Sequence, residues 1–363
     1  MDCQFPLITL EANQTPRQHG LLQGEMHKAA INELVEIRTQ LMLAKNPSLS
    51  KNLIPLAMEQ WYVTKRFSTH LCEELEGIAE AANLSIPDLV ILNNYTDFRD
   101  IELPEEGCST IHTSHNKKVI SGQTWDMHRS AKRFLSVIHV KSQGGKPEQL
   151  FLSLVGCSAL MGMNTYGCLA GVNNINTKNA KAGLIWPVLI RKLLTQQNLP
   201  SMRSMLLEAP VTSGHNYLLS DDNEGEHWEV TPHISEQVGK IQTHQNGSIF
   251  HTNHCIGESI QKIEDRKSLS STTLERYDLL TKKSGTVTDF HSMIKLLQDH
   301  EGEPKSLCSH FESGTQDPSS TCGGGVYDIT DGDVYLWRGC PIHDNNYISY
   351  KFKRDGSHFI KVL

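Results

Sequence analysis

The succession of strand-like segments after residue 107 is the feature that most constrains the fold of this chain. Strand-like runs follow one another between turns, helical residues come in blocks, and βαβ units are few. The expected strands lie near 108–115, 118–123, 134–140, 149–154, 168–173, 217–220, 227–230, 237–242, 249–252, 325–329, 333–338, 347–352 and 358–362. This pattern is typical of two stacked, largely antiparallel sheets with helices outside, so we predict an α+β layered fold.

The first hundred residues, in contrast, are predicted to be almost wholly helical. Thr15 and Pro16 suit the N-cap and the first position of a helix over 15–45, in which apolar residues recur at helical spacing. A second helical stretch is expected over 54–82, and Ser85 begins a third with a capping-box pattern. Further helices are expected over 184–208, 271–282 and 288–299.

Composition excludes several classes of function. The 363 residues are 38% apolar and 21% charged, as in soluble globular proteins, and suffice for one large domain or two average ones. With a net charge of -7, the protein lacks the excess of basic residues that is typical of proteins that bind nucleic acids or anionic membranes, so neither partner is expected. The apolar stretch 5–10 is too short for a secretory signal, so we expect a cytoplasmic protein. Whether the chain forms a homo-oligomer stays open.

One of the nine cysteines stands apart from the rest. The cysteines are widely spaced with no Cys-x-x-Cys pair, which favours reduced thiols that act mostly as small buried hydrophobes. Cys108, however, lies where the helical part gives way to strands, and the preceding Gly107 leaves room beside its carbonyl group. A catalytic thiol at Cys108 is therefore one interpretation, and a buried structural cysteine that opens a strand is the alternative.

Several short motifs together carry a family resemblance. They are Gly107-Cys108-Ser109-Thr110, Gln123-Thr124-Trp125-Asp126, the segments 163–164, 167–173, 250–255 and 326–328, and a paired-glycine segment at 17–24. In this order the chain resembles, over nearly its whole length, the acyl-coenzyme A:6-aminopenicillanic acid acyltransferase family of N-terminal nucleophile (Ntn) hydrolases. Bile-salt and penicillin V hydrolases, acid ceramidase-like amidases and β-alanyl-amine hydrolases share that architecture.

The resemblance implies both a fold and a maturation step. It implies a four-layer αββα sandwich made as a precursor that cuts itself between Gly107 and Cys108. The products would be an α chain 1–107 and a β chain 108–363, which stay associated as one globular unit. The substrate would be a small molecule with a linear amide bond or an acyl donor, and no cofactor is implied.

The chemistry of such a site also follows from residue types. A free cysteine thiol has a pKa of roughly 8.5 and is mostly protonated at neutral pH, so it needs a base. A Cys108 freed by cleavage would carry its own α-amino group, whose ordinary pKa of about 7.7–8.0 lets it take the thiol proton directly or through water. Nucleophile and base then reside on one residue, and the intermediate is an acyl-thioester.

Four further residues receive roles from the resemblance. Asp126 would hold the new amino group, Asn253 and Asn173 would stabilise the oxyanion, and Arg276 matches an arginine near the nucleophile of bile-salt hydrolases. The residues alone allow plainer interpretations. Asp126 would be a surface hairpin residue, Asn173 would bond to backbone in a turn, and Arg276 would lie on a solvated helix face.

Two departures separate the chain from the penicillin-acylating branch. The arginine that helps to bind the penicillin nucleus falls on or near Pro318, which carries no charge. The family's Gln-Asn-Trp-Asp motif has threonine as its second residue here, at Thr124. Both departures argue against penicillin chemistry and leave the nucleophile machinery intact.

Two rival functions remain open, and a metal site is considered and not predicted. Cys108 could act unprocessed with a histidine such as His112 or His128, or the chain could be an inactive ligand-binding protein on the same fold. In the stretch 251–255, a strand would put His251 and Cys255 on one face and His254 on the other. No compact set of four ligands emerges there, so no metal site is predicted.

Overall fold

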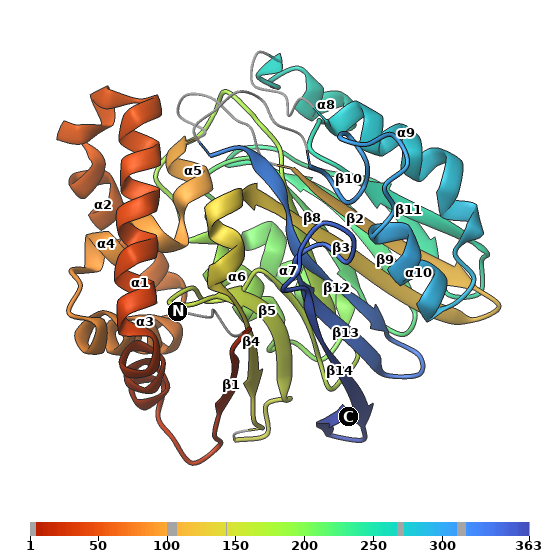
Figure 1. The fold of residues 1–363 in the computed structure, drawn as a ribbon, viewed down its shortest axis with the longest axis horizontal. Helices are drawn as coiled ribbons and strands as arrows, with labels where there is room; N and C mark the ends of the chain where they lie inside the picture. The colour runs from red at the N-terminus through yellow and green to blue at the C-terminus, as the bar shows by residue number, and fades with distance from the viewer. Residues whose placement is uncertain (1–4, 100–106, 143, 267–271, 311–316, 363) are drawn as a thin grey trace.

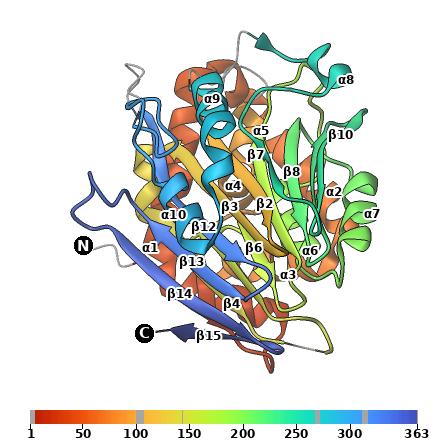
Figure 2. The ribbon, with the colours of Figure 1, turned by 90° about the vertical axis from the view of Figure 1, so that its right-hand side faces the viewer.

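Two β-sheets stacked face to face form the centre of the molecule, and helices cover both outer faces (Figure 1). Residues 5–99, 107–142, 144–266, 272–310 and 317–362 are described in this computed structural model. Figure 2 shows the strands of the two sheets between helices of the N-terminal part and of the 270–300 region. The predicted α+β fold with four αββα layers is confirmed.

The first sheet has eight strands in the order β1-β4-β5-β6-β7-β8-β9-β10. Their bounds are β1 (Leu7–Leu10), β4 (Leu135–Val140), β5 (Gln149–Leu154), β6 (Met161–Asn164), β7 (Leu169–Asn174), β8 (His215–Ser220), β9 (Glu224–Val230) and β10 (Ser235–Gln242). β1 pairs with β4 in parallel, and every other pair in this sheet is antiparallel.

The second sheet has seven antiparallel strands in the order β11-β2-β3-β12-β13-β14-β15. Their bounds are β2 (Cys108–His115), β3 (Lys118–His128), β11 (Gly247–His251), β12 (Ser319–Asp328), β13 (Asp333–Arg338), β14 (Ile348–Asp355) and β15 (His358–Val362). Asn116 and Lys117 join β2 to β3 with φ values of 50° and 65°, the backbone that a two-residue hairpin turn of matching twist requires. The predicted hairpin is thus confirmed, and β3 runs on through the Gln-Thr-Trp-Asp motif.

Helices of the N-terminal part cover the first sheet, and two later helices cover the second. The former are α1 (Pro16–Lys45), α2 (Leu53–Phe67), α3 (Thr69–Ala82), α4 (Ile86–Asn93) and α5 (Tyr95–Arg99). The latter are α9 (Thr273–Lys283) and α10 (Phe290–Leu297), while α6 (Trp186–Leu193) and α7 (Leu199–Glu208) contact β7 and β8, and α8 (Glu258–Gln261) contacts β10. Among the described helices, none combines the length and the apolar character needed to cross a bilayer.

Capping and short breaks determine where the helices begin and end. Thr15 caps α1 as predicted, because its hydroxyl accepts the backbone N–H of Gln18 and the Gln18 side chain accepts that of Thr15. The single helix expected over 54–82 is wrong: Ser68 has φ -153° and ψ 88° and separates α2 from α3. The helical block expected over 184–208 is likewise divided, into α6 and α7.

The prediction of an almost wholly helical first hundred residues misses one strand. Residues Leu7–Leu10 form β1, with alternate side chains buried and half-buried, and extend the first sheet beyond β4. A four-residue apolar run carries too little periodicity to tell a strand from a helix turn. The N-terminal part is therefore built into the sheet as well as packed onto it.

The paired glycines near the start of α1 have a packing role. A Cβ atom on Gly20 would lie 1.9 Å from the carbonyl oxygen of Glu74, and one on Gly77 would lie 2.3 Å from that of Arg17. Helices α1 and α3 thus approach closely enough that backbone meets backbone, which only glycine permits at these contacts. The segment 17–24 that carries part of the family resemblance is explained by this helix crossing.

Candidate active site

Cys108 is the first residue of β2 and lies in a small pocket between the two sheets. Cys108 is 8% exposed, and it pairs with Trp125 on β3. The pocket has an empty volume of about 340 Å³. It is lined by Thr96, Cys108, Trp125, Asp126, Met127, Val172, Asn174, Trp186, His215 and Asn253. The structure therefore brings three of the predicted site residues, Cys108, Asp126 and Asn253, to one pocket.

Gly107 is wedged between two charged side chains. A Cβ atom at this position would lie 2.8 Å from Nη2 of Arg276 and 2.9 Å from Oδ2 of Asp126. Its carbonyl oxygen accepts the backbone N–H of Asp126 at 2.9 Å. Glycine at 107 is thus required by space, and the carbonyl that precedes Cys108 is polarised by a fixed donor. The residues 103–106 that precede it in the motif lie outside the described part of the chain.

Asn253 holds the backbone nitrogen of Cys108. Its Oδ1 accepts the N–H of Cys108 at 2.7 Å, and its Nδ2 donates to the carbonyl oxygen of Asn174 at 2.8 Å. The backbone N–H of Asn253 donates in turn to Oγ1 of Thr273 at the start of α9. These contacts fix the orientation of the amide, so its nitrogen faces the end of β7 beside the pocket.

Arg276 binds Cys108 from the other side. Its Nη1 donates to the carbonyl oxygen of Cys108 at 2.6 Å and to Oγ of Ser109 at 3.0 Å, and its Nη2 donates to Oδ1 of Asn253 at 2.8 Å. Arg276 is 0% exposed, so the interpretation as a solvated helix-face residue is wrong. Burial lowers the pKa of the guanidinium, and the negative charge of Asp126 opposes that effect. It stays a cation, as arginine does in proteins.

Asp126 is a buried carboxylate rather than a surface hairpin residue. It is 2% exposed, and its Oδ1 accepts the hydroxyl of Thr321 at 2.7 Å. Burial raises the pKa of this carboxyl to about 6, although Arg276 and the Thr321 hydroxyl pull it down. Its Oδ2, the oxygen that faces Gly107, accepts no hydrogen bond from any described residue. An oxygen without a donor next to the Gly107–Cys108 bond is available to a proton or an ammonium group.

Asn173 lies one residue away from the position that lines the pocket. Its Oδ1 accepts hydrogen bonds from Oγ1 of Thr110 at 2.6 Å and from Nδ2 of Asn216 at 2.8 Å, and the residue is fully buried. Because side chains alternate along a strand, Val172 and Asn174 are the β7 residues that line the pocket, and Asn173 between them does not. The oxyanion role of Asn173 stays a prediction. Asn174, which the sequence analysis missed, was signalled only by this alternation.

The motif residues around Cys108 also tie the two sheets together. Nε2 of Gln123 on β3 donates to the carbonyl oxygen of Val172 at 2.6 Å, and its Oε1 accepts the Val172 N–H at 2.9 Å. Within the second sheet, the hydroxyl of Thr124 accepts the N–H of Ser109. The conspicuous polar residues of the two motifs therefore fix the hairpin that begins at Cys108 to β7 of the opposite sheet.

The two histidines weighed as partners of Cys108 are engaged elsewhere. His112 lies four residues further along β2, about 13 Å at the usual rise of a strand, and its Nδ1 lies 2.8 Å from Oγ of Ser121. Burial lowers the pKa of His112 to about 3. Nδ1 of His128 lies 2.8 Å from Oγ of Ser130 and 3.3 Å from Oδ2 of Asp317.

A histidine that the sequence analysis missed lines the pocket itself. His215 is buried at the start of β8, with Nε2 3.5 Å from Oδ1 of Asp97. Burial lowers the pKa of His215 to about 4, so its imidazole is neutral at pH 7. A base this weak is poorly matched to a cysteine thiol.

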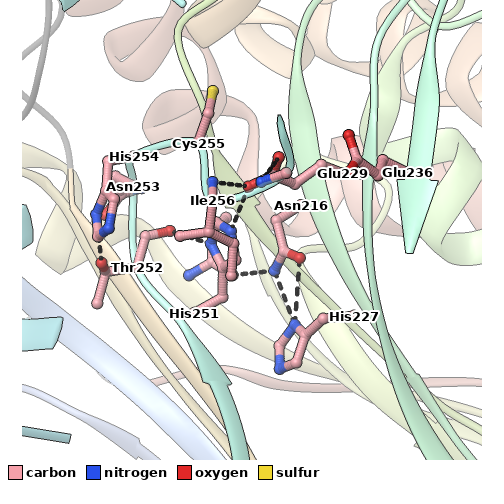
Figure 3. Close-up of polar contacts among 12 residues, drawn as sticks. Asn216, His227, Glu229, Glu236, His251, Thr252, Asn253, His254, Cys255 and Ile256 are labelled. Atoms are coloured by element: carbon pink, nitrogen blue, oxygen red, sulfur yellow. Dashed lines mark hydrogen bonds and ion pairs between the residues drawn. The ribbon is translucent and has the colours of Figure 1, made fainter. Parts of the chain in front are cut away.

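The stretch 251–255 divides its side chains among separate contacts (Figure 3). Nε2 of His251 lies 2.8 Å from Oε1 of Glu229, and that carboxylate also accepts the N–H groups of Ile256 and Gly257. The His254 ring contacts the Thr252 hydroxyl, and in Figure 3 the sulfur of Cys255 points away from both rings. His251 therefore acts with Glu229 to hold the loop that follows β11.

Fold and site together define an enzyme of the Ntn-hydrolase class: a strand-opening cysteine in an αββα sandwich, with Asp126, Asn253 and Arg276 gathered around its backbone. The chain belongs to the acyl-coenzyme A:6-aminopenicillanic acid acyl-transferase family, whose model matches residues 113–342. The predicted family is thus confirmed.

Individual relatives are similar to different degrees. The 40 kDa form of the acyl-coenzyme A:6-aminopenicillanic-acid-acyltransferase of Emericella nidulans is 24% identical over 315 residues, which cover 85% of this chain and 86% of that protein. Among solved structures, a mutant of the conjugated bile acid hydrolase from Clostridium perfringens is 10% identical with a TM-score of 0.39, covering 70% of this chain and 96% of that one. The penicillin V acylase from Agrobacterium tumefaciens is 13% identical with a TM-score of 0.37, covering 68% and 86%.

Proposed function

We propose that this chain is a precursor that cleaves its own Gly107–Cys108 bond, and that the mature enzyme acts on linear amides through a thioester on Cys108. One observation carries the proposal: fixed hydrogen bonds hold that peptide bond from both sides. The Gly107 carbonyl oxygen accepts the N–H of Asp126, and the Cys108 N–H donates to Asn253. A bond held in this way has its carbonyl polarised and its nitrogen positioned before any reaction starts.

In the precursor step, the Cys108 sulfur attacks the Gly107 carbonyl carbon. Asp126 would support this step twice: its N–H donates to the Gly107 carbonyl oxygen, on which the oxyanion forms, and its Oδ2, which lies beside Gly107, would take the thiol proton. The carbon–nitrogen bond then breaks, the nitrogen takes up a proton, and a thioester joins Gly107 to the sulfur. Water hydrolyses the thioester, leaving a Gly107 carboxylate and a Cys108 residue with a free thiol and a free amino group.

In turnover, the same residues act on an external amide. The Cys108 amino group takes the thiol proton, and the thiolate attacks the substrate carbonyl. Asn253, and Asn173 as predicted from the sequence, stabilise the tetrahedral oxyanion, while Arg276 orients Asn253 and the Cys108 carbonyl. The protonated amino group gives its proton to the leaving amine, and water or a second amine resolves the thioester.

The fragments 1–107 and 108–363 would stay associated after cleavage. Strand β1 of the first fragment pairs with β4 of the second through four residue pairs. Apolar side chains of α1, α3 and α4 share one core cluster with strands of the first sheet. The first fragment also supplies Thr96 to the pocket wall, so neither fragment contains the whole site.

The pocket wall favours an apolar acyl group. Trp125, Met127, Val172 and Trp186 are apolar residues that line it beside Cys108. Pro318, on or near which the family's penicillin-binding arginine falls, carries no charge, and its carbonyl oxygen accepts the N–H of Arg129. We therefore propose a linear N-acyl amide rather than a penicillin nucleus as substrate. A panel of N-acyl amino acids, β-alanyl amines and acylated β-lactams, assayed on processed protein, identifies the class.

A reducing compartment such as the cytoplasm suits this chemistry. The reaction needs a thiol at Cys108, and none of the eight cysteines in the described part of the chain forms a disulfide.

The intact mass of the purified protein tests the proposal. We expect wild-type protein to yield two fragments, 1–107 and 108–363, with the second starting Cys-Ser-Thr by N-terminal sequencing. Cys108→Ala should leave one uncut, inactive chain, since it removes the nucleophile of both steps. Wild-type protein that stays whole and has full amidase activity would instead support the unprocessed Cys/His hydrolase. Protein that binds ligand equally well with Cys108→Ala and turns nothing over would support the inactive binding protein.

A further inference from the structure

Four metal-ligating side chains converge at one end of the second sheet, and none of them lines the Cys108 pocket. They belong to His300, His310, Cys340 and His343, and one ligand atom from each lies within 4.8 Å of the others. Nε2 of His300 lies 3.1 Å from Sγ of Cys340, and the rings of His310 and His343 have centroids 4.6 Å apart. The proposed catalytic mechanism uses none of these residues.

The four side chains come from three chain segments. His300 follows α10, His310 lies before β12, and Cys340 and His343 follow β13 with the spacing Cys-x-x-His. Ligands at two-residue spacing on one turn, completed by residues distant in sequence, are typical of structural zinc sites.

The environment of Cys340 suits a thiolate. The residue is fully buried, and the backbone N–H groups of Ile342 and His343 both point at its sulfur from 3.4 Å. Sulfur that accepts backbone N–H groups is stabilised as an anion, which is the form that binds metal. Cys308 contacts the same group, with its Sγ 3.6 Å from Nε2 of His310, and supplies a second sulfur at the edge of the cluster.

We propose that His300, His310, Cys340 and His343 form a structural zinc site. Imidazole and thiolate are the ligands that Zn²⁺ prefers, and three neutral imidazoles with one thiolate leave the site a net charge of about +1. In a tetrahedral zinc site, neighbouring ligand atoms are about 3.3–3.8 Å apart. The present spacing of up to 4.8 Å therefore closes with side-chain movements of about 1 Å. A carboxylate lies next to the ligands, since Oε1 of Glu303 is 2.9 Å from Nε2 of His343.

The site would clamp the segment that supports the catalytic carboxylate. Ser309, next to His310, exchanges two hydrogen bonds with Thr321, whose hydroxyl donates to Asp126. A metal that joins His310 to the end of β13 would therefore also stabilise Ser309 and Thr321, the residues through which this segment contacts Asp126.

Metal uptake by the whole protein in a thiol-free reducing buffer tests the proposal. After treatment with a chelator, the protein is titrated with Co²⁺ as a spectroscopic probe and with Zn²⁺ in competition. We expect one equivalent to bind, a sulfur-to-cobalt charge-transfer band, displacement of cobalt by zinc, and a higher thermal midpoint with zinc, because a ligand of the native state stabilises it. Cys340→Ser should remove the band, and His310→Ala should weaken binding at least about 100-fold.

Matched controls separate this site from the other cysteines and histidines. Cys72 in α3 and His115 in β2 lie outside the cluster, so the variants Cys72→Ala and His115→Ala should bind cobalt as the wild type does. Wild-type protein without saturable uptake, or Cys340→Ser with an unchanged sulfur-to-cobalt band, would overturn the proposal. The proposal would also be overturned if the protein contained a disulfide between Cys308 and Cys340 and still took up no metal once that disulfide was reduced. Because every readout is binding or stability, failure here is distinct from failure of the proposed cleavage.

Discussion

Asp126 and Glu229 are two buried carboxylates in neighbouring polar networks, and they differ in how completely their oxygens are hydrogen-bonded. Glu229 is fully buried and accepts the ring of His251 and the N–H groups of Ile256 and Gly257 (Figure 3). Asp126 is equally enclosed, yet its Oδ2 accepts no hydrogen bond from the described residues, and burial raises its pKa to about 6.

The difference distinguishes a structural carboxylate from a reactive one. Leaving a buried acceptor unpaired costs about 1–3 kcal/mol, so an unpaired oxygen persists only where the rest of the fold enforces it. Here the unpaired oxygen faces Gly107, at the bond we propose to be cut. A carboxylate whose acceptors are all used, such as Glu229, holds a loop in place and has no capacity left for chemistry.

The largest expected effect is on kcat and comes from replacing Asn253, which lies with Asp126 in the Cys108 pocket. Asn253→Ala should lower kcat of the processed enzyme by about 10²–10³-fold, because it removes the proposed oxyanion donor and the acceptor for the Cys108 nitrogen. Single-turnover kinetics on a chromogenic amide measure this. Asn246→Ala, in the exposed turn before β11, is the control and should keep kcat. An Asn253 variant with wild-type turnover would remove Asn253 from the mechanism.

The next effect concerns the pH dependence of stability. Since the pKa of Asp126 is raised to about 6 from an ordinary value near 3.8, the folded chain holds a proton that the unfolded chain releases. The free energy of unfolding should therefore fall by up to about 3 kcal/mol as pH rises from about 4 to about 6, and then level off.

Chemical denaturation of uncut protein isolates this contribution. The Cys108→Ala variant should show the decline between pH 4 and 6, and the Cys108→Ala/Asp126→Asn double variant should lack it. Parallel curves for the two proteins would mean that Asp126 titrates normally and is paired after all.

The smallest effect on chemistry is expected at Glu229. Glu229→Gln replaces one acceptor oxygen with an NH₂ group that meets the donors of His251 or the loop. We expect a loss of about 1–3 kcal/mol in the free energy of unfolding, with kcat unchanged within about twofold. Thermal denaturation and steady-state assays measure the two quantities. A fall in kcat as large as that of Asn253→Ala would erase the contrast between the two networks.

Local signals in the sequence predict most elements of this fold. A few neighbouring residues are enough to predict each of three features: the cap at Thr15, the Asn116-Lys117 turn and the strand 333–338. β1 and β6 (Met161–Asn164) were missed because four residues are too few to show a period, and their partners lie elsewhere in the chain.

The site shows the same limit more sharply. The motifs identify Cys108, but nothing local shows that Arg276 is fully buried or that Asp126 has an unpaired oxygen. Those properties depend on how α9 and β12 pack against β2 and β3, which is tertiary structure. The histidine cluster was missed for a similar reason, since its ligands span more than forty residues and only the Cys340–His343 spacing was visible.

The paired hydrogen bonds between Gln123 and Val172 have a consequence for specificity. They join the sheet that carries Cys108 to the opposite sheet within a few residues of the pocket, so the two sheets cannot slide past each other there. The width of the Cys108 pocket is thus fixed by the spacing of the two sheets. A change of the ligand that this pocket accepts would then have to come from the side chains that line it, such as Trp125 and Trp186.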